Sequence, residues 1–490
     1  MVFSSLQFIL IFMPVFFTIY YLVPNRYRNV VLLLGSLSFY AVGTYKTPGH
    51  FVIFIVSMLV DYGLAMLMTK RPSGKKLFLI AGIVFHILAL GFYKYFNFII
   101  NELAGAFPNA DIGLPFTIIL PIGISFYTFQ GLSYLIDVYR GTVEAERSPL
   151  DFCVYISMFA QLIAGPIVNY SDVANELHHR EIRKSNVLDG FGTFIFGMGL
   201  KVLLANPLGK LWTNSTNIGF ESLSTPLAWM SIFAYSFQIY FDFFGYSLMA
   251  IGLGKMMGFN LPKNFDFPYL ATSMTEFWRR WHITLGSWFR EYVYIPLGGS
   301  RRGTAKTIRN LFVVWLLTGI WHGAGYNFMI WGMMLFAIIA IEKYFIGDFL
   351  ERHPVVGHLY MVFLIPLSWA VFEVGNTQQL GMLFKRLFPF FGQGFWSEFR
   401  YDYIKYLKMY WPFFIAAILL STHLPFDLLA RLKASTESTP RGKHLAVVPG
   451  EERLKPVSRA VIIAILSAIF IGGLYCMYRG YDDPFLYFRF

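Results

Sequence analysis

Long apolar runs constrain this chain more than any other feature of its sequence. Ten of them come close to, or exceed, the roughly 20 residues that a helix needs to cross a hydrocarbon core of ~30 Å. They lie near residues 5–23, 29–45, 50–68, 77–96, 114–138, 188–206, 226–253, 355–374, 411–429 and 460–478. The sequence therefore predicts an all-α polytopic membrane protein with about ten spanning helices.

The composition agrees with this class. Only 14% of the residues are charged and 56% are hydrophobic, whereas soluble domains average about 25% charged residues. The formal net charge of +12 would indicate nucleic-acid binding in a soluble chain, but in a membrane chain it reflects the Lys and Arg of cytoplasmic loops. We therefore expect the lipid bilayer, and no nucleic acid, as a partner. The first apolar run lacks a basic n-region and a cleavage site, so it is expected to remain as the first helix.

The distribution of Lys and Arg predicts the orientation of the helices. Loop 24–29 carries two basic residues and loop 69–76 carries four, whereas loop 44–49 between them carries one. Because cytoplasmic loops collect positive charge, loops 24–29 and 69–76 are placed in the cytoplasm and the N-terminus outside. Loop 375–410, placed outside with five basic residues, fits this scheme least, and its orientation stays open.

Two further apolar runs, 152–168 and 311–341, are predicted to enter and leave the membrane on the same side. Basic residues in 140–151 and 169–187 flank the first run, and Gly165-Pro166 interrupts it, since proline cannot donate a hydrogen bond within a helix. Irregular backbone at membrane depth is tolerated only against protein or a water-filled cavity.

No internal repeat or soluble domain is evident in the sequence. Residues 1–490 are therefore expected to form a single membrane domain. The segment 430–459 carries seven basic residues among Ser, Thr, Pro and Gly, and we expect it to be a basic cytoplasmic loop within that domain.

One histidine, His322, lies inside the run 311–341, in Trp321-His322-Gly323-Ala324-Gly325. The eleven residues 311–321 make ~16 Å of helix, about half of the ~30 Å hydrocarbon depth, and the glycines allow a turn there. An ionisable side chain at this depth is costly to bury and usually serves function. A structural histidine bonded to a neighbouring carbonyl is the alternative. The companion His282, which follows Trp278-Arg279-Arg280-Trp281, favours the functional interpretation.

The expected chemistry of His322 follows from its pKa. A neutral imidazole, with an ordinary pKa of ~6.5, can act as a general base near pH 7. It would remove the proton of an acceptor hydroxyl, whose oxygen then attacks a thioester carbonyl. A covalent acyl-histidine is an alternative that the sequence does not separate from this one. For His282 we consider two roles, either orientation of the donor or acceptor, or a structural one.

Nine basic residues between positions 255 and 309 alternate with aromatic ones. A helix at the membrane–water boundary accounts for such a mixture. The functional interpretation is that some arginines bind the phosphates of a cytoplasmic acyl donor, for which planar guanidinium groups are well suited. The donor-binding residues expected on this basis are Arg279, Arg280, Arg301 and Arg302. The residues expected to line a cavity are Trp278, Trp281, Trp321, Asp242 and Tyr294.

Two further points limit the chemistry. Asp242 shares a helix face with Gln238, and it either lines the cavity or pairs with a buried donor. No metal site is expected, because neither an HExxH-type nor a cysteine–histidine spacing appears. The two cysteines, Cys153 and Cys476, lie in separate apolar segments and indicate no disulfide framework.

Several segments carry a resemblance to a known family. Besides the two histidine segments, they are Met1-Val2-Phe3-Ser4-Ser5, residues 120–129 (LPIGISFYTF), residues 136–141 (IDVYRG), Ala164-Gly165-Pro166 and Tyr240-Phe241-Asp242-Phe243. On these residues the chain closely resembles the membrane-bound O-acyltransferase family over nearly its whole length. Within that family it is most similar to the bacterial branch of the alginate O-acetylase membrane subunit.

The resemblance implies a many-helix membrane fold around a central funnel with an internal tunnel. It implies acetyl transfer from cytoplasmic acetyl-CoA, a co-substrate with no bound cofactor, for O-acetylation of an exported polysaccharide. The family's essential histidine, in the Trp-His-Gly segment, maps onto His322, and the preceding one maps onto His282. The resemblance further implies a multi-pass protein of the bacterial inner membrane. Its partners would be an extracytoplasmic SGNH-type acetyltransferase and a polysaccharide biosynthesis or secretion complex. No stretch identifies the polymer.

The sequence departs from the family after Phe243. It reads Phe244-Gly245-Tyr246-Ser247-Leu248 where the family usually reads Ser-Gly-Tyr-Ser-Asp, so a hydroxyl and a carboxylate are missing. Three rival functions also stay open: a D-alanyl transferase that takes its thioester from a carrier protein and acts on teichoic acid, a non-catalytic transporter of the acyl donor, and a structural scaffold.

Overall fold

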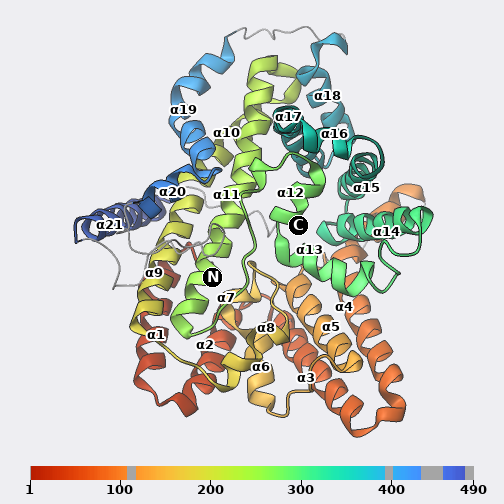
Figure 1. The fold of residues 1–490 in the computed structure, drawn as a ribbon, viewed down its shortest axis with the longest axis vertical. Helices are drawn as coiled ribbons and strands as arrows, with labels where there is room; N and C mark the ends of the chain where they lie inside the picture. The colour runs from red at the N-terminus through yellow and green to blue at the C-terminus, as the bar shows by residue number, and fades with distance from the viewer. Residues whose placement is uncertain (1, 108–116, 392–400, 432–455, 481–490) are drawn as a thin grey trace. The chain divides into compact units, whose positions relative to one another are not determined.

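A computed structural model describes residues 2–107, 117–391, 401–431 and 456–480. The described residues fold into helices joined by short connections, and they contain no β-strand (Figure 1). The chain forms two compact units. The first comprises Met1–Gly190, Ala250–Pro262 and Ser287–Pro296, and the second comprises Phe191–Met249, Lys263–Gly286 and Leu297–Phe490.

The first unit is built from the N-terminal helices. They are η1 (Phe8–Phe12), α1 (Met13–Leu22), η2 (Asn25–Tyr27), α2 (Arg28–Gly43), α3 (Pro48–Lys70), η3 (Pro72–Gly74), α4 (Lys75–Ala106), α5 (Ile124–Arg140), α6 (Pro149–Ser157), α7 (Phe159–Leu162) and α8 (Tyr170–His178). A buried pair joins α3 to α4, since His86 Nε2 lies 2.8 Å from Asp61 Oδ1. α5 passes this pair at Gly131, where a Cβ would lie 2.2 Å from Asp61 Oδ2. Only glycine permits so close an approach.

The predicted break in the run 152–168 is present. α6 ends at Ser157, Met158 has an extended ψ of 112°, and α7 has only 4 residues. Gly165 then adopts a φ of 125°, in the region that favours glycine. The segment is buried almost throughout, which agrees with irregular backbone being sheltered by protein.

Most of the remaining helices belong to the second unit. Of these helices, η7 belongs to the first unit, and α9, α11 and α13 are shared between the units along the chain. The remaining helices are α9 (Lys184–Gly199), η4 (Leu200–Ala205), α10 (Asn206–Ile218), η5 (Phe220–Ser222), α11 (Thr225–Met257), η6 (Pro268–Leu270), α12 (Met274–Arg280), α13 (Ile283–Phe289), η7 (Arg290–Tyr294), α14 (Thr304–His322), α15 (Tyr326–Ile341), η8 (Glu342–Ile346), α16 (Gly347–Arg352), α17 (Pro354–Glu373), α18 (Thr377–Leu387), η9 (Pro389–Phe391), α19 (Asp402–Leu420), α20 (Leu424–Arg431) and α21 (Pro456–Tyr478). The core of the second unit is rich in aromatic side chains.

Seven helices within the described residues are long and apolar enough to cross a membrane. They are Pro48–Lys70, Pro72–Ala106, Lys184–Ile218, Tyr326–Arg352, Pro354–Glu373, Asp402–Leu420 and Ala460–Tyr478. The first predicted span is a shorter apolar helix, Phe8–Leu22. The predicted run 226–253 lies in α11, whose 33 residues extend ~50 Å. The all-α multi-pass class is thus confirmed, while the predicted funnel and tunnel stay a prediction.

The helices around His322 are longer than the apolar run 311–341 predicts. α14 begins at Thr304 and has 19 residues, or ~28 Å, because the polar stretch before residue 311 is also helical. The return helix continues to Arg352, a stretch of 27 residues that could cross a membrane by itself. The estimate of half-depth from eleven apolar residues is therefore wrong about the helix length.

Two predicted loops lie partly outside the described residues. Of the basic loop 430–459, positions 432–455 are not described, and of loop 375–410, positions 392–400 are not described. The predicted run 114–138 also begins in such a stretch, and its described part is α5 together with the residues before it.

Candidate active site

Two glycines let the helices that flank His322 approach each other closely. α14 and α15 pack against each other and are joined by Gly323-Ala324-Gly325. A Cβ at Gly319 would lie 2.5 Å from the carbonyl oxygen of Phe328, and one at Gly332 would lie 2.5 Å from that of Trp315. These contacts leave no room for a larger residue, so the two glycines fix the geometry of the hairpin that carries His322.

His322 is the last residue of α14 and lies among aromatic side chains. Its ring centroid is 4.7 Å from that of Trp321, 5.2 Å from that of Trp331 and 5.2 Å from that of Phe372, each in an edge-to-face arrangement. Such contacts favour one orientation of the imidazole. The residue is only half-buried. The predicted base is thus held in a mostly apolar environment. The residue keeps some accessible surface, whereas its Nε2 is buried.

A hydrogen bond holds Phe372 in place beside His322. The side-chain amide of Asn327, at the start of α15, donates to the carbonyl oxygen of Phe372 near the end of α17, at 2.6 Å. Asn327 is itself buried, so this bond satisfies a polar group that would otherwise be costly to bury. It ties the turn after His322 to a third helix.

The predicted tryptophans meet in one aromatic cluster. Trp278 contacts Trp331 at a centroid distance of 5.5 Å, and Trp281 contacts Trp369 at 4.8 Å. Trp331 and Trp369 stack 6.1 Å apart, so they connect α12 to the ring of His322. Trp281 is buried, and so is Trp321, which directly precedes His322. The structure therefore brings Trp278, Trp281 and Trp321 into the cluster that holds His322, and their role as cavity-lining residues stays a prediction.

A buried carboxylate positions α12, the helix that carries Trp278. Glu342 accepts hydrogen bonds from the backbone N–H of Met274 at 2.6 Å and of Thr275 at 2.8 Å. These N–H groups are at the start of α12, where they have no partner within the helix, and a negative charge is favourable there. Glu342 is 2% exposed, so it acts as a fixed anchor for the segment Trp278-Arg279-Arg280-Trp281.

His282 lies between α12 and α13 and is sealed by packing. It is 1% exposed, and its ring meets Phe243 edge-to-face at 4.7 Å. Its Nδ1 lies 3.0 Å from Oδ1 of Asn264, an oxygen that also accepts from the Thr284 hydroxyl at 2.9 Å. The Asn264 amide nitrogen donates to Ser247 at 3.2 Å. The residue is thus fixed in a small polar network.

The backbone and the protonation of His282 are both unusual. Its φ is 45°, in the left-handed region that costs a non-glycine residue of order 1–3 kcal/mol. Burial lowers the pKa of His282 to about 3, because an imidazolium loses hydration when it is enclosed. The ring is therefore neutral at pH 7, and the observations favour the structural or positioning role over proton transfer.

The two predicted arginine pairs differ in how firmly they are held. Arg280 donates to Glu276 at 2.6 and 3.0 Å, whereas Arg279 is exposed. Arg301 and Arg302 are exposed in the turn that precedes α14. In that turn Gly298 has a φ of 107° and Gly299 one of 56°, values that favour glycine. Donor binding by these arginines stays a prediction.

Asp242 and Tyr294 are the two other residues that the sequence predicts to line the cavity. Asp242 forms a buried ion pair with Lys201 at 2.5 Å, with side-chain exposures of 3% and 0%. This favours the alternative that Asp242 pairs with a buried donor. Tyr294 belongs to the first unit, in η7. Among the described residues, no group of three or more His, Cys, Asp or Glu could hold a metal ion.

Four residues that shape this site went unrecognised in the sequence: Asn264, Trp331, Glu342 and Phe372. Asn264 and Phe372 lie in stretches with no motif. Trp331 is one aromatic residue among many in an apolar run. Glu342 follows that run directly and resembles an ordinary helix end. A possible signal is the carboxylate next to a membrane-length helix, since a buried charge needs partners.

The comparisons with known proteins agree with this architecture. The family model described as the membrane-bound O-acyltransferase family matches residues 142–349. A probable alginate O-acetylase of Pseudomonas aeruginosa is 39% identical over 80% of this chain and 75% of its own. A probable alginate O-acetylase of Pseudomonas putida is 34% identical over the full length of both chains. A peptidoglycan O-acetyltransferase of Helicobacter pylori is 33% identical over 77% of this chain and 78% of its own.

The fold and the comparisons together define a polytopic membrane acyltransferase. The chain belongs to the membrane-bound O-acyltransferase family, and it is a membrane O-acyltransferase. The family that the sequence motifs predicted is thereby confirmed.

Proposed function

We propose that this acyltransferase transfers acetyl groups from cytoplasmic acetyl-CoA for the O-acetylation of a polysaccharide exported across the bacterial inner membrane. The observation that carries the proposal is the half-buried His322 at the end of α14, among Trp321, Trp331 and Phe372. The names of the relatives, alginate O-acetylase and peptidoglycan O-acetyltransferase, support an acetyl donor and a glycan acceptor.

In this proposal His322 is the general base. Its neutral imidazole removes the proton of the acceptor hydroxyl, and the oxygen attacks the carbonyl carbon of the thioester. The carbon–sulfur bond breaks, and the imidazolium returns the proton to the leaving thiolate. The surrounding aromatic rings exclude water that would hydrolyse the thioester. In the alternative the imidazole nitrogen attacks first, and an acetyl-histidine passes the acetyl group to the hydroxyl.

The other residues support this step from a distance. His282 and Asn264 hold the turn between α12 and α13, and Glu342 holds the start of α12, so both fix the tryptophan cluster against His322. The guanidinium groups of Arg279, Arg280, Arg301 and Arg302 bind the phosphates of acetyl-CoA, since they can donate two parallel hydrogen bonds to such groups. An extracytoplasmic SGNH-type acetyltransferase within a polysaccharide secretion complex receives the acetyl group.

The test measures transfer of radiolabelled acetyl from acetyl-CoA in membranes that contain the protein and its polysaccharide machinery. We expect label in the polysaccharide with the natural sequence, and its loss with His322→Gln. The exposed His358 provides a matched control, because His358→Gln removes a histidine from the same unit without changing the cluster. Equal amounts of folded protein are verified by gel filtration in detergent.

Two outcomes would contradict the proposal. Full labelling by His322→Gln would remove the assignment of the base and favour a transporter or scaffold. Labelling only from a D-alanyl carrier protein, with none from acetyl-CoA, would replace the acetyl donor. Label on the protein itself that neutral hydroxylamine removes, and that is absent in His322→Gln, would select the acetyl-histidine route.

A further inference from the structure

The first unit contains an open cavity of about 880 Å³, within the range of 300–1,000 Å³ common for small-molecule sites. Its lining comes from four segments, within residues 25–29, 150–151, 175–186 and 255–260. All four lie in stretches that the distribution of Lys and Arg places in the cytoplasm. The fold thus gathers separate basic loops of the sequence around one hollow.

Positive charge dominates this cavity. Its cationic lining residues are Arg26, Arg28, Arg180, Arg183 and Lys255, and its acidic ones are Asp151, Glu176 and Glu181. Two helices also begin there, α2 at Arg28 and α9 at Lys184. Neither has an acidic residue in its first turn. The dipoles of these two helices add to the attraction for an anion.

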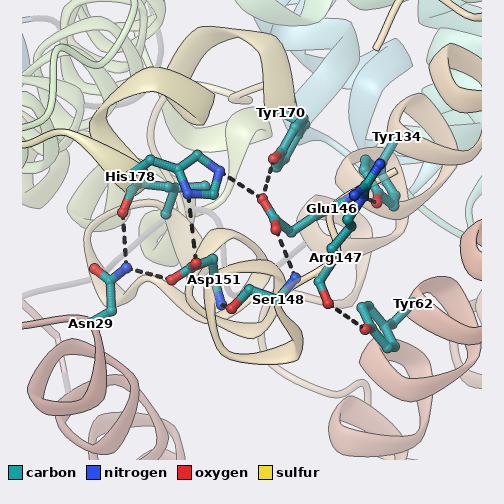
Figure 2. Close-up of polar contacts among 10 residues, drawn as sticks. Asn29, Tyr62, Tyr134, Glu146, Arg147, Ser148, Asp151, Tyr170 and His178 are labelled. Carbon is teal, nitrogen blue, oxygen red and sulfur yellow. Dashed lines mark hydrogen bonds and ion pairs between the residues drawn. The ribbon is translucent and has the colours of Figure 1, made fainter. Parts of the chain in front are cut away.

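The carboxylates of the cavity already have partners. Figure 2 shows Asp151 accepting from the Asn29 amide at 2.5 Å and His178 lying between two acids. The Nε2 of His178 is 2.9 Å from Glu146, and its Nδ1 is 3.8 Å from Asp151. Glu146 also accepts from the Tyr170 hydroxyl at 2.5 Å.

The two glutamates that line the cavity are paired as well. Glu176 accepts from the Asn260 amide at 3.1 Å, and Glu181 pairs with Arg183 at 2.7 Å. Lys255 is likewise paired, with Asp189 at 2.5 Å. These neighbours therefore largely satisfy the acids. Among the residues that the structure describes, no carboxylate forms an ion pair with Arg26, Arg28 or Arg180.

Two of those arginines converge on a single tyrosine. The Nη1 of Arg180 donates to the Tyr20 hydroxyl at 2.6 Å, and the guanidinium of Arg28 lies 5.7 Å from the centre of the same ring. Arg180 is fixed further, since Nη2 donates to Asn29 at 2.5 Å and the guanidinium lies 4.2 Å above the ring of Phe259. Two cations close to one phenol repel each other, so an anion beside them would be stabilised.

Arg28 itself lacks the contacts that guanidinium groups normally make. Its Nε is buried, and no hydrogen-bond partner for it exists among the residues that the structure describes. Its guanidinium lies near the Tyr20 ring. A buried donor without an acceptor is costly. The cavity therefore offers a positioned and partly desolvated guanidinium.

We propose that this cavity is a binding site for a phosphate-bearing anion, with Arg28 as the main contact and Arg180 and Arg26 beside it. A phosphate accepts two parallel hydrogen bonds from a guanidinium, and the volume admits a group up to the size of a nucleotide. The ligand is either the headgroup of an anionic phospholipid of the inner leaflet or a soluble phosphate ester. The proposal does not depend on the acyl-transfer chemistry, because the first unit alone forms the cavity.

The experiment uses the purified full-length protein in nanodiscs and two probes. Inorganic pyrophosphate is titrated into phosphatidylcholine nanodiscs at constant ionic strength, and phosphatidylglycerol nanodiscs are compared with phosphatidylcholine ones, each by thermal unfolding. A soluble ligand predicts saturable stabilisation by pyrophosphate, and a lipid predicts stabilisation by phosphatidylglycerol. In Arg28→Gln the affinity for the stabilising probe is expected to fall about tenfold, because one charge-assisted contact is lost.

Matched variants make the result specific. Lys76→Gln removes an exposed basic residue from another predicted cytoplasmic loop and should leave the effect unchanged. Arg28→Lys keeps the charge and should restore part of it. If Arg28→Gln does not fold, the double variant Arg26→Gln and Arg183→Gln, at two exposed positions, carries the test with an expected severalfold loss. Stabilisation by neither probe, or an equal loss in Lys76→Gln, would overturn the proposal.

Discussion

The two histidines that follow tryptophan residues occupy contrasting places in the second unit. His282 is 1% exposed and lies in a left-handed turn, with one ring nitrogen bonded to Asn264. His322 ends a long helix, is half-buried, and meets aromatic rings on several sides. The same Trp-His dipeptide thus serves once in a sealed polar network and once in an accessible aromatic setting.

The difference bears on which of the two histidines is suited to act as a general base. A general base requires access to the reacting hydroxyl and a pKa near the working pH. His282 lacks both properties. Burial lowers its pKa to about 3, and its side chain is enclosed by its neighbours. The accessible surface of His322 makes it the better candidate base.

The largest expected effect is on the rate of acyl transfer in His322→Gln. Loss of a general base typically lowers a rate by about 10²–10⁴-fold. The unfolding temperature should stay close to that of the natural protein, because His322 is only half-buried. Transfer of labelled acetyl and thermal unfolding are measured on the same preparation. A variant that retains its rate, or one that loses stability instead, would remove the contrast.

The second effect is on stability, in His282→Ala. We expect a loss of about 2–4 kcal/mol, since the change leaves a cavity and deprives Asn264 of a partner. His282→Asn should lose less, because asparagine tolerates the left-handed backbone and can bond to Asn264. Chemical unfolding in mild detergent measures both. If the two variants are equally stable, the network does not hold the turn.

The third effect concerns the hairpin of His322, in Gly319→Ala. The added Cβ would meet the Phe328 carbonyl oxygen at 2.5 Å, and forcing such a contact apart costs about 1–3 kcal/mol. Gly381→Ala in α18 is the control, because nothing lies within 4 Å of its Cβ position. Activity should fall with stability in the first variant only. If Gly319→Ala leaves both stability and activity unchanged, the two helices can move apart at no cost.

The fourth effect is the pH dependence that His282 contributes. Its folded pKa of about 3 lies below the ~6.5 of an unfolded histidine, so the unfolded state binds the proton first. Stability is fully present above pH ~6.5 and decreases as the pH falls toward 3, by at most about 1.4 kcal/mol per pH unit. Unfolding of the natural protein and of His282→Asn is compared between pH 4 and 7.5. Identical slopes would contradict a neutral, buried ring.

The smallest effect is expected at the exposed arginines. Arg301→Gln should raise the KM for acetyl-CoA severalfold with little change in kcat, because an exposed phosphate contact is worth about 1 kcal/mol. Lys306→Gln, also exposed and nearby in sequence, should leave KM unchanged. Steady-state kinetics at low salt distinguishes them. An unchanged KM in Arg301→Gln would assign the turn to the membrane boundary alone.

Much of the fold follows from local patterns. Long apolar stretches such as Pro48–Lys70 and Pro354–Glu373 form helices as predicted, since hydrocarbon-length runs leave the backbone few alternatives. In the run that contains Gly165-Pro166 the helix is broken, but the break comes earlier, at Met158, and α7 ends at Leu162. The same logic fails at α14, because this helix begins at Thr304, in the mostly polar stretch 304–310. Apolar length underestimates a helix that begins in a polar stretch.

The site was predictable only in part. His282 and His322 are visible because each follows a tryptophan in a recognisable segment. Their partners are not, since Asn264 is 18 positions from His282 and Phe372 is 50 positions from His322. Asp242 illustrates the same limit, because its partner Lys201 lies 41 positions away. Spacing along the chain contains no information on such contacts.

The class of this protein, a helical membrane acyltransferase, follows from the amino-acid sequence, because apolar length and short motifs are local properties. Folding was needed to distinguish the enclosed histidine from the half-buried one, and to bring separate basic loops around a common cavity. These are differences in burial and distance between residues far apart in the chain. Burial shifts the pKa of an imidazole, and packing sets the distances between guanidinium groups. Both effects arise only when the helices pack.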